Sequence, residues 1–201
     1  MAGEDDNIIP LYERNALAFD ALRGRELFEK PWLDRFAALV PPRGEILDLG
    51  CGAAEPMAAS LIRDGFRVTG VDASETLIAL CRERFPDRAW FVADMREFSL
   101  PIRCNGILAW HSFFHLNQDD QRAMFSRFAA LSAPGAALMF TSGHFDGVAM
   151  GDFAGEPLYH ASLSAQEYTA LLEENGFAVV SHVAQDPQCG GATVWLAKRI
   201  S

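Results

Sequence analysis

The chain has 201 residues, half of them hydrophobic, which suits one large domain with a substantial core. Its formal net charge is −10 and it contains no run of Lys and Arg, so nucleic acid is a poor candidate partner. The acidic start MAGEDDNIIP is unlike a signal peptide, and no apolar stretch approaches the roughly 20 residues of a membrane span. The four cysteines form no CxxC pair, and we expect free thiols in a cytoplasmic protein without membrane contact.

The N-terminal segment predicts two helices. The pattern from residue 11 to 22 is helical, and a second helix opens near Pro31, because proline tolerates the first helical turn. The motif PPRG at 41–44 ends this second helix. We expect residues 1–42 to form a helical lid on a core of residues 43–201, within a single domain.

From residue 45 onward, short apolar runs alternate with amphipathic helical patterns. The predicted strands are EILDL (45–49), RVTGVD (67–72), AWFVAD (89–94), NGILAW (105–110) and AALMFTS (136–142). Continuous apolar strands between amphipathic helices predict a parallel sheet that is covered on both faces.

The last third of the chain follows a different pattern. We expect a glycine-rich loop at 143–157, then a helix that starts after Ser164 with Glu167 in a capping-box position and ends at Gly176. The strands AVVSHVA (178–184) and ATVWLAKR (192–199) are too closely linked for a parallel crossover and should pair antiparallel. The predicted fold is therefore a Rossmann-like α/β three-layer sandwich with a seven-stranded, mostly parallel sheet whose last strand is antiparallel.

The glycine turn after the first strand predicts a nucleotide-type cofactor. A dinucleotide motif needs GxGxxG, but here Glu55 replaces the third glycine, and Asp48 precedes Gly50 and Gly52. A diphosphate would meet two carboxylates there, whereas a cofactor with an ammonium and a sulfonium would be attracted. S-adenosylmethionine carries both positive charges and no phosphate, so we expect it as the cofactor.

Two further acids follow the next two strands. Asp72 can bind both ribose hydroxyls, and Asp94 can accept from the adenine amino group while the Met95 amide faces a ring nitrogen. For Asp72 and Asp94 taken singly, capping of the following helix explains the residue equally well. Suitable groups at three successive strand ends make coincidence much less plausible.

The motifs LDLGCGAAEP, VTGVDAS, FVADMREF and GILAWHSFFHL resemble those of class I S-adenosylmethionine-dependent methyltransferases over residues 45–142. The resemblance implies methyl transfer, with the methionine part held by Asp48 and the turn of Gly50, Cys51 and Gly52. It also implies that Asp72 holds the ribose and that Ala73, Asp94 and Met95 surround the adenine. The segment from Ala109 to His111, which includes Trp110, would lie near the sulfonium.

Two positions depart from the family pattern. Ala54 stands where many members have a third glycine, and His111 stands where relatives often have aspartate. The tail patterns PLYHASLS and CGGATVWLA resemble small bacterial methyltransferases. That resemblance implies a reaction but no acceptor.

Histidines supply the candidate catalytic and acceptor-binding groups. His111 is the candidate base, since an oxygen or protonated nitrogen acceptor must lose a proton. His115, Tyr159 and His160 are candidates for the acceptor site, although His115 also suits a core position. The HxxxH spacing would place His111 and His115 on one helical face, but Ser112 occupies the glutamate position of a metalloprotease motif, and we predict no metal.

Aromatic residues extend the candidate site. Tyr12 can offer a cation–π contact to the sulfonium, whereas Trp32 more plausibly packs its helix onto the sheet. Several rim aromatics suggest a partly hydrophobic, small-molecule acceptor, namely Trp110, Phe113, Phe114, Phe145 and Phe153. Two alternatives stay open: a non-catalytic S-adenosylmethionine-binding protein and an NAD-dependent oxidoreductase.

Overall fold

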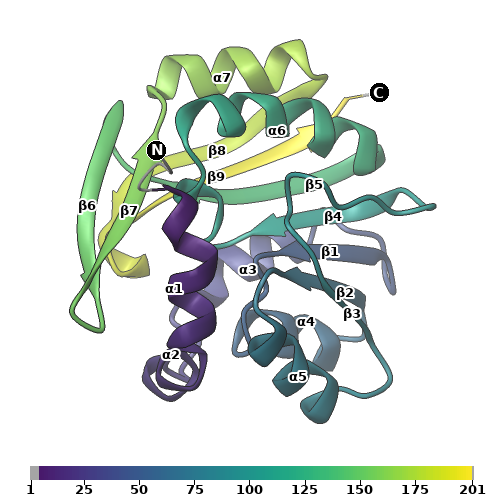
Figure 1. Ribbon diagram of the computed structural model, residues 1–201. Helices are drawn as coiled ribbons and strands as arrows, with labels where there is room; N and C mark the ends of the chain where they lie inside the picture. Colours follow the sequence, from purple (N-terminus) through teal and green to yellow (C-terminus); the bar gives the residue numbers. More distant parts are fainter. Residues whose placement is uncertain (1–4, 201) are drawn as a thin grey trace.

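A computed structural model describes residues 5–200, apart from the side chain of Asp6. It contains a seven-stranded sheet with the order β3-β2-β1-β4-β5-β9-β8 (Figure 1). Only β9 runs antiparallel to its neighbours, as the sequence predicts. The strands are β1 (Glu45–Leu49), β2 (Arg67–Asp72), β3 (Ala89–Val92), β4 (Cys104–Ala109), β5 (Ser132–Ser142), β8 (Phe177–Asp186) and β9 (Ala192–Arg199). The strand order reverses between β1 and β4, where ligands of such sheets bind.

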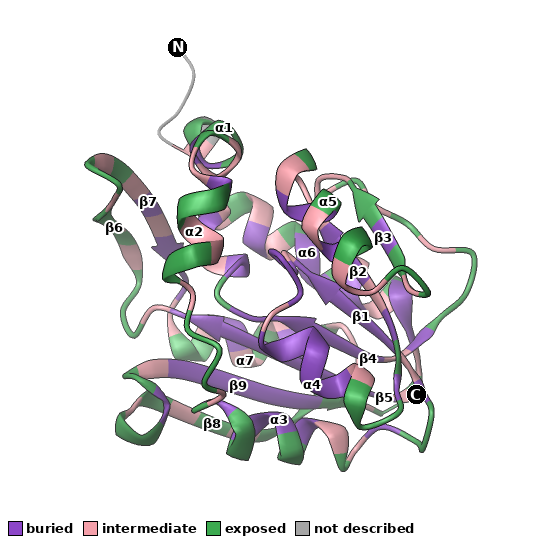
Figure 2. Cartoon of the chain, turned by 90° about the horizontal axis from the view of Figure 1, so that it is seen from below, coloured by how far each residue is buried: buried purple, intermediate pink, exposed green. Residues whose placement is uncertain are grey.

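Helices cover both faces of the sheet and bury two separate apolar cores (Figure 2). One face carries α3 (Lys30–Ala37), α4 (Met57–Arg63) and α5 (Glu75–Arg84), and the other carries α6 (Gln118–Leu131) and α7 (Ala165–Glu174). Successive residues of β1 point to opposite faces, so Ile46 joins the first core and Leu47 the second. This alternation produces the predicted three-layer sandwich.

The N-terminal segment forms two short helices where the sequence predicts one. Helix α1 (Ile8–Arg14) and helix α2 (Ala16–Leu22) are separated at Asn15. In Figure 1, α1 lies between a β-hairpin on one side and α4 and α5 on the other. Helix α3 instead packs on the sheet, where Trp32 is buried and donates to Asp186 at 2.7 Å.

The glycine-rich segment after β5 is not the loop that the sequence predicts. Strands β6 (Gly147–Phe153) and β7 (Glu156–Ser162) form a separate two-stranded antiparallel sheet with seven paired positions. Ala154 and Gly155 turn the chain with positive φ angles, and backbone pairing then satisfies the polar groups that a loop would leave to solvent. The hairpin brings β7 beside the carboxyl end of the main sheet.

The segment after β4 also differs from the prediction. His111 and His115 do not share an α-helical face, because His111 adopts φ +50° and only a 3₁₀ turn, Phe113–His115, follows. The positive φ angle bends the chain sharply at the end of β4.

No described helix has the length and apolar character that a membrane crossing requires.

Candidate functional site

The turn between β1 and α4 is built for close approach of its neighbours. Gly50 and Gly52 have φ angles of +72° and +55°, in the left-handed region that favours glycine. A Cβ atom on Gly50 would lie 2.2 Å from the Cβ of Ser112, so the segment after β4 packs directly on the turn. Ala54, which stands where the methyltransferase pattern that the motifs resemble often has a third glycine, also takes a positive φ angle of 68°.

Two carboxylates flank this turn. Asp72 accepts hydrogen bonds from the backbone N–H groups of Gly52 and Ser74, each at 2.9 Å. Burial raises the pKa of Asp72 against the opposing effect of these backbone donors. Asp48 is 3% exposed and has no side-chain hydrogen-bond partner among residues 5–200. Burial, with Asp72 nearby, raises the pKa of Asp48 to about 7. A cationic ligand would stabilise the ionised form of both groups.

Asp94 lies where the sequence predicts, but its carboxylate already has a strong partner. Arg96 donates to Asp94 from Nη2 at 2.6 Å and to Asp120 from Nη1 at 2.7 Å. Burial alone would raise the pKa of Asp94, but the hydrogen bonds and charge of Arg96 outweigh this effect, so the pKa is lowered overall. An adenine amino group at this place would share an oxygen with Arg96.

Two cavities open beside the turn and share part of their walls. The first lies toward β2 and the residues after β3, and among the predicted residues it is lined by Tyr12, Gly50, Gly52, Asp72, Ala73, Asp94, Met95, His111 and His115. The second extends toward β7, and its lining includes Tyr12, Asp48, Gly50, Cys51, Gly52, Trp110, His111, His115 and His160. The structure therefore brings all but one of the predicted site residues to one connected region.

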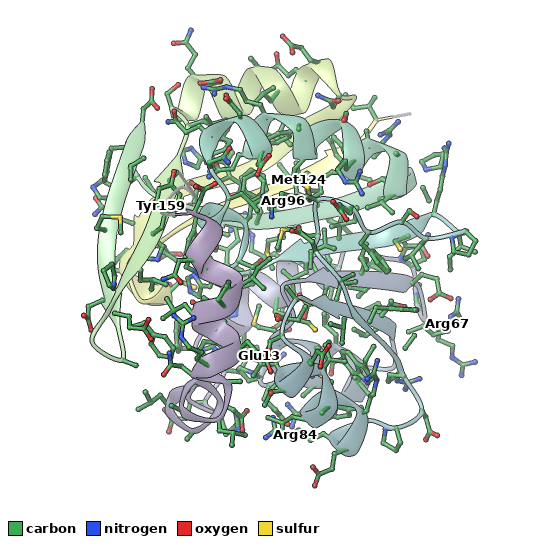
Figure 3. All side chains as sticks on the ribbon, in the orientation of Figure 1. Glu13, Arg67, Arg84, Arg96, Met124 and Tyr159 are labelled. Atoms are coloured by element: carbon green, nitrogen blue, oxygen red, sulfur yellow. The ribbon has the colours of Figure 1, made fainter. Side chains whose placement is uncertain are left out.

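Tyr159 is the exception, because it lines neither cavity. Its ring packs with Ile8 and Ala161 in a small cluster next to α1. Figure 3 shows Tyr159 at the side of the hairpin that faces α1. Its backbone carbonyl nevertheless accepts a hydrogen bond from His115 Nδ1 at 2.9 Å.

This hydrogen bond fixes the tautomer of His115. A carbonyl only accepts, so Nδ1 carries the proton and Nε2 is an acceptor. The Tyr12 hydroxyl, 3.0 Å from Nε2, is then the donor. Burial lowers the pKa of His115 to about 3, and burial with Asp72 nearby raises that of Tyr12 to about 12. Both groups are therefore neutral at pH 7, and they link α1 to the sheet.

His111 and His160 differ from His115, because neither imidazole has a hydrogen-bond partner within the described part of the chain. His111 is held through its backbone N–H, which donates to Thr141 Oγ1 at 2.9 Å, while its ring is open to the cavities. Burial, followed by the charge of Arg23, lowers the pKa of His111 to about 4, and burial also lowers that of His160. Both rings are free to exchange hydrogen bonds with a ligand.

Two other predicted residues line the second cavity. Trp110 is 6% exposed and its Nε1 donor is buried without a partner in residues 5–200. Cys51 is a buried free thiol, and burial raises its pKa well above the usual range, which suits a packing residue better than a nucleophile. Phe113 is in the core, Phe145 is exposed outside both cavities and Phe153 stacks on Tyr12.

Sequence reasoning missed the contacts that hold α1 and α2 over the cavities. Glu13 of α1 accepts hydrogen bonds from the Ser74 hydroxyl and, at 2.6 Å, from Thr76 Oγ1. These bonds connect α1 to the start of α5 (Figure 3). Asp20 forms two hydrogen bonds with Arg84 of α5, at 2.6 and 2.8 Å. These partners lie more than 60 residues apart, and no motif marks them.

On its other side, α1 is attached to the hairpin. Arg14 donates to Glu156 at 2.6 Å, and Asn15 donates to the same carboxylate at 3.2 Å. Phe19 of α2 also reaches the turn, since a Cβ atom on Gly52 would lie 3.3 Å from its ring.

Within the described residues, no cluster of three or more His, Cys, Asp or Glu side chains could hold a metal ion.

Comparisons with known proteins agree with this architecture. Residues 46–135 match the family model of a methyltransferase domain. The dTDP-3-amino-3,6-dideoxy-alpha-D-glucopyranose N,N-dimethyltransferase of Streptomyces fradiae is 35% identical over 105 residues, which are 49% of this chain and 40% of that protein. The chain spans only 36–40% of the length of the curated relatives it matches.

Solved structures share the whole fold at low identity. The Burkholderia thailandensis 1,6-didemethyltoxoflavin-N1-methyltransferase covers 100% of this chain, and this chain covers 92% of it, with a TM-score of 0.79 and 18% identity. CalS10, an amino pentose methyltransferase from Micromonospora echinaspora, matches with a TM-score of 0.70 and 19% identity over 92% of this chain and 96% of its own. The chain is therefore similar to a methyltransferase domain over residues 46–135, and it shares its overall fold with these solved methyltransferases.

Proposed function

We propose that the chain transfers a methyl group from S-adenosylmethionine to a small molecule in the cytoplasm. The observation that carries the proposal is the pair of carboxylates, Asp48 and Asp72, beside the glycine turn. The two arginines that line the cavities are already paired, Arg96 with Asp94 and Arg23 with Glu29 at 2.7 Å. A diphosphate would therefore meet carboxylates and no uncommitted cation, whereas a cationic cofactor suits this charge arrangement.

The residues present fit such a cofactor. Among the described residues, the buried carboxylate of Asp48 and the buried Nε1 donor of Trp110 have no partner, so they suit the ammonium and the carboxylate of a methionine group, respectively. Asp72 would hold the ribose, with Ala73 and Met95 around the adenine. Tyr12 would offer its ring to the sulfonium. S-adenosylmethionine supplies an already activated methyl group, so the chain mainly has to align the acceptor and remove its proton.

Proton removal falls to an imidazole in this proposal. His111 is our candidate base, with His160 as the second imidazole open to the acceptor, and burial keeps both in the neutral form that accepts a proton. Within the segment 1–42 that the sequence predicts to be a lid, α1 and α2 would cover the cavities, whereas α3 packs on the sheet. The names of two similar proteins support a small-molecule acceptor, since one is a dTDP-3-amino-3,6-dideoxy-alpha-D-glucopyranose N,N-dimethyltransferase and the other has 1,6-didemethyltoxoflavin bound.

Calorimetric titration with S-adenosylmethionine tests the role of Asp72. We expect Asp72→Ala and the isosteric Asp72→Asn to weaken binding roughly 10–100-fold, because hydrogen bonds to a charged group contribute about 1.5–3 kcal/mol. Asp87→Ala is the matched control, since Asp87 is exposed and lines neither cavity. Unchanged affinity in folded Asp72 variants would refute the proposed placement.

Release of S-adenosylhomocysteine separates an enzyme from a non-catalytic binding protein. A screen of small-molecule acceptors should identify at least one that raises this release above the rate without acceptor. Loss of that activity in His111→Ala, with unchanged cofactor affinity, is the expected signature of a base or acceptor-positioning residue.

A further inference from the structure

We propose that the methyl acceptor is a flat aromatic heterocycle, methylated on a ring nitrogen or a ring-bound oxygen, and that it binds in the part of the second cavity toward β7, next to the methionine group of the cofactor. This inference rests on the proposed function and specifies its substrate class. Its basis is an unbroken series of seven aromatic side chains along that cavity, which we call the aromatic wall. In contact order it consists of Trp110, His111, Phe114, His160, His115, Tyr12 and Phe19.

Each ring of the aromatic wall contacts the next. Consecutive ring centroids lie 4.8–5.8 Å apart, within the range of favourable aromatic contacts. The rings come from α1, α2, the segment after β4 and β7, so four separate parts of the chain meet to form one surface. Such a continuous aromatic surface favours a ligand that presents a planar π face over a puckered, hydroxyl-rich sugar.

The polar groups of the wall match the edge of a heterocycle. His115 and Tyr12 bond to one another, which leaves His111 and His160 as imidazoles without partners among the described residues. A neutral imidazole offers one N–H donor and one nitrogen acceptor. A ring N–H or O–H next to a ring lone pair presents the complementary groups.

The charges near the wall give no preference for a cationic amine. Among the described residues that line this cavity, only Arg23 is positively charged, and it is bonded to the buried Glu29 at 2.7 Å. The two carboxylates of the cavity, Asp48 and Glu55, come from the strand and turn proposed to hold the cofactor. The wall itself consists of neutral side chains at pH 7.

The methyl transfer needs only the cofactor, the acceptor and an imidazole that takes up the acceptor's proton. The acceptor nitrogen or oxygen forms a bond to the methyl carbon as the carbon–sulfur bond breaks, and that electron pair stays on sulfur. The acceptor's proton moves to the free nitrogen of His111 or His160 and then to water. No oxidant, reductant or metal is needed.

Binding measurements on the protein saturated with S-adenosylhomocysteine test this inference. The flat probes are lumazine, xanthine and 6-hydroxyquinoline, and glucosamine is the non-aromatic amine probe. We expect at least one flat probe to bind and glucosamine not to bind. Phe114→Leu, which keeps an apolar side chain but removes the ring, should weaken the flat probe about fivefold. The same change at exposed Phe145, outside both cavities, should leave it unchanged.

Each outcome addresses a separate claim. If S-adenosylhomocysteine binds but all three flat probes fail, or if only glucosamine binds, the substrate class is refuted while the proposed function stands. Equal weakening in Phe114→Leu and Phe145→Leu, or no weakening in either, refutes the aromatic wall as the binding surface. If S-adenosylhomocysteine itself does not bind, the proposed function fails.

Discussion

Replacing Gly50 by alanine is expected to abolish S-adenosylmethionine binding and to lower the free energy of unfolding by about 3 kcal/mol. Two effects add at this position. The left-handed backbone at φ +72° costs an L-residue about 1–2 kcal/mol, and overpacking a tight contact costs typically 1–3 kcal/mol. The contact is severe because the new Cβ would lie 2.2 Å from the Cβ of Ser112, which cannot rotate away. Denaturant unfolding measures the loss of stability, and calorimetric titration measures the loss of S-adenosylmethionine binding.

Gly52→Ala is the matched control, since Gly52 has a similar positive φ angle but only the Phe19 ring within 3.3 Å. We expect it to cost about 1 kcal/mol, mainly from backbone strain. The double variant Gly50→Ala/Ser112→Gly should recover part of the lost stability by removing the opposing Cβ. Equal effects of the two single alanine variants would contradict the close packing of Ser112 on Gly50.

Asp48→Asn should change stability and binding in opposite directions. Burial raises the pKa of Asp48 from its ordinary value near 4 to about 7, so ionising this group is unfavourable in the folded protein without ligand. The penalty is absent below pH 4, grows between pH 4 and 7, and stays constant at higher pH. Since asparagine also buries a polar group, we expect a net gain of roughly 1–2 kcal/mol at pH 8, or about 3–6 °C in Tm, and no gain at pH 4.

The same substitution should weaken S-adenosylmethionine binding roughly 10–100-fold at pH 7.5, because the carboxylate that pairs with the ammonium is lost. In the unmodified chain, affinity should rise between pH 5.5 and 7.5 as Asp48 ionises, and the rise should disappear in Asp48→Asn. Asp87→Asn, at an exposed site, should change neither property. A lower Tm at pH 8 together with unchanged affinity would show that Asp48 has a structural role only.

The fold and the cofactor-binding edge follow from local sequence patterns. Strand β1 and strand β9 occupy the predicted residues, because short apolar runs bounded by glycine or proline leave few alternatives. Since parallel strands end at one edge, the positions of Asp48, Asp72 and Asp94 also follow from the pattern. Gly176, with φ +77°, ends α7 as the sequence predicts.

The remaining features depend on pairings between distant residues. The β6–β7 hairpin lies in a glycine-rich segment whose weak alternation does not distinguish strand from loop. The bond from Tyr12 to His115 spans 103 residues, and the bond from Arg96 to Asp120 spans 24. The latter helps to hold Arg96 beside Asp94, whose carboxylate the motif alone leaves free for adenine. Local patterns specify elements, whereas these contacts arise from how the elements pack.

Parallel titrations with S-adenosylmethionine and NADH, at equal protein concentration and pH 7.5, test the central claim that this site accepts a cationic cofactor and rejects a diphosphate. We expect S-adenosylmethionine to bind at one site per chain and NADH to give neither binding heat nor a fluorescence change. NADH binding as tight as, or tighter than, S-adenosylmethionine, and weakened by Asp72→Ala, would contradict the account.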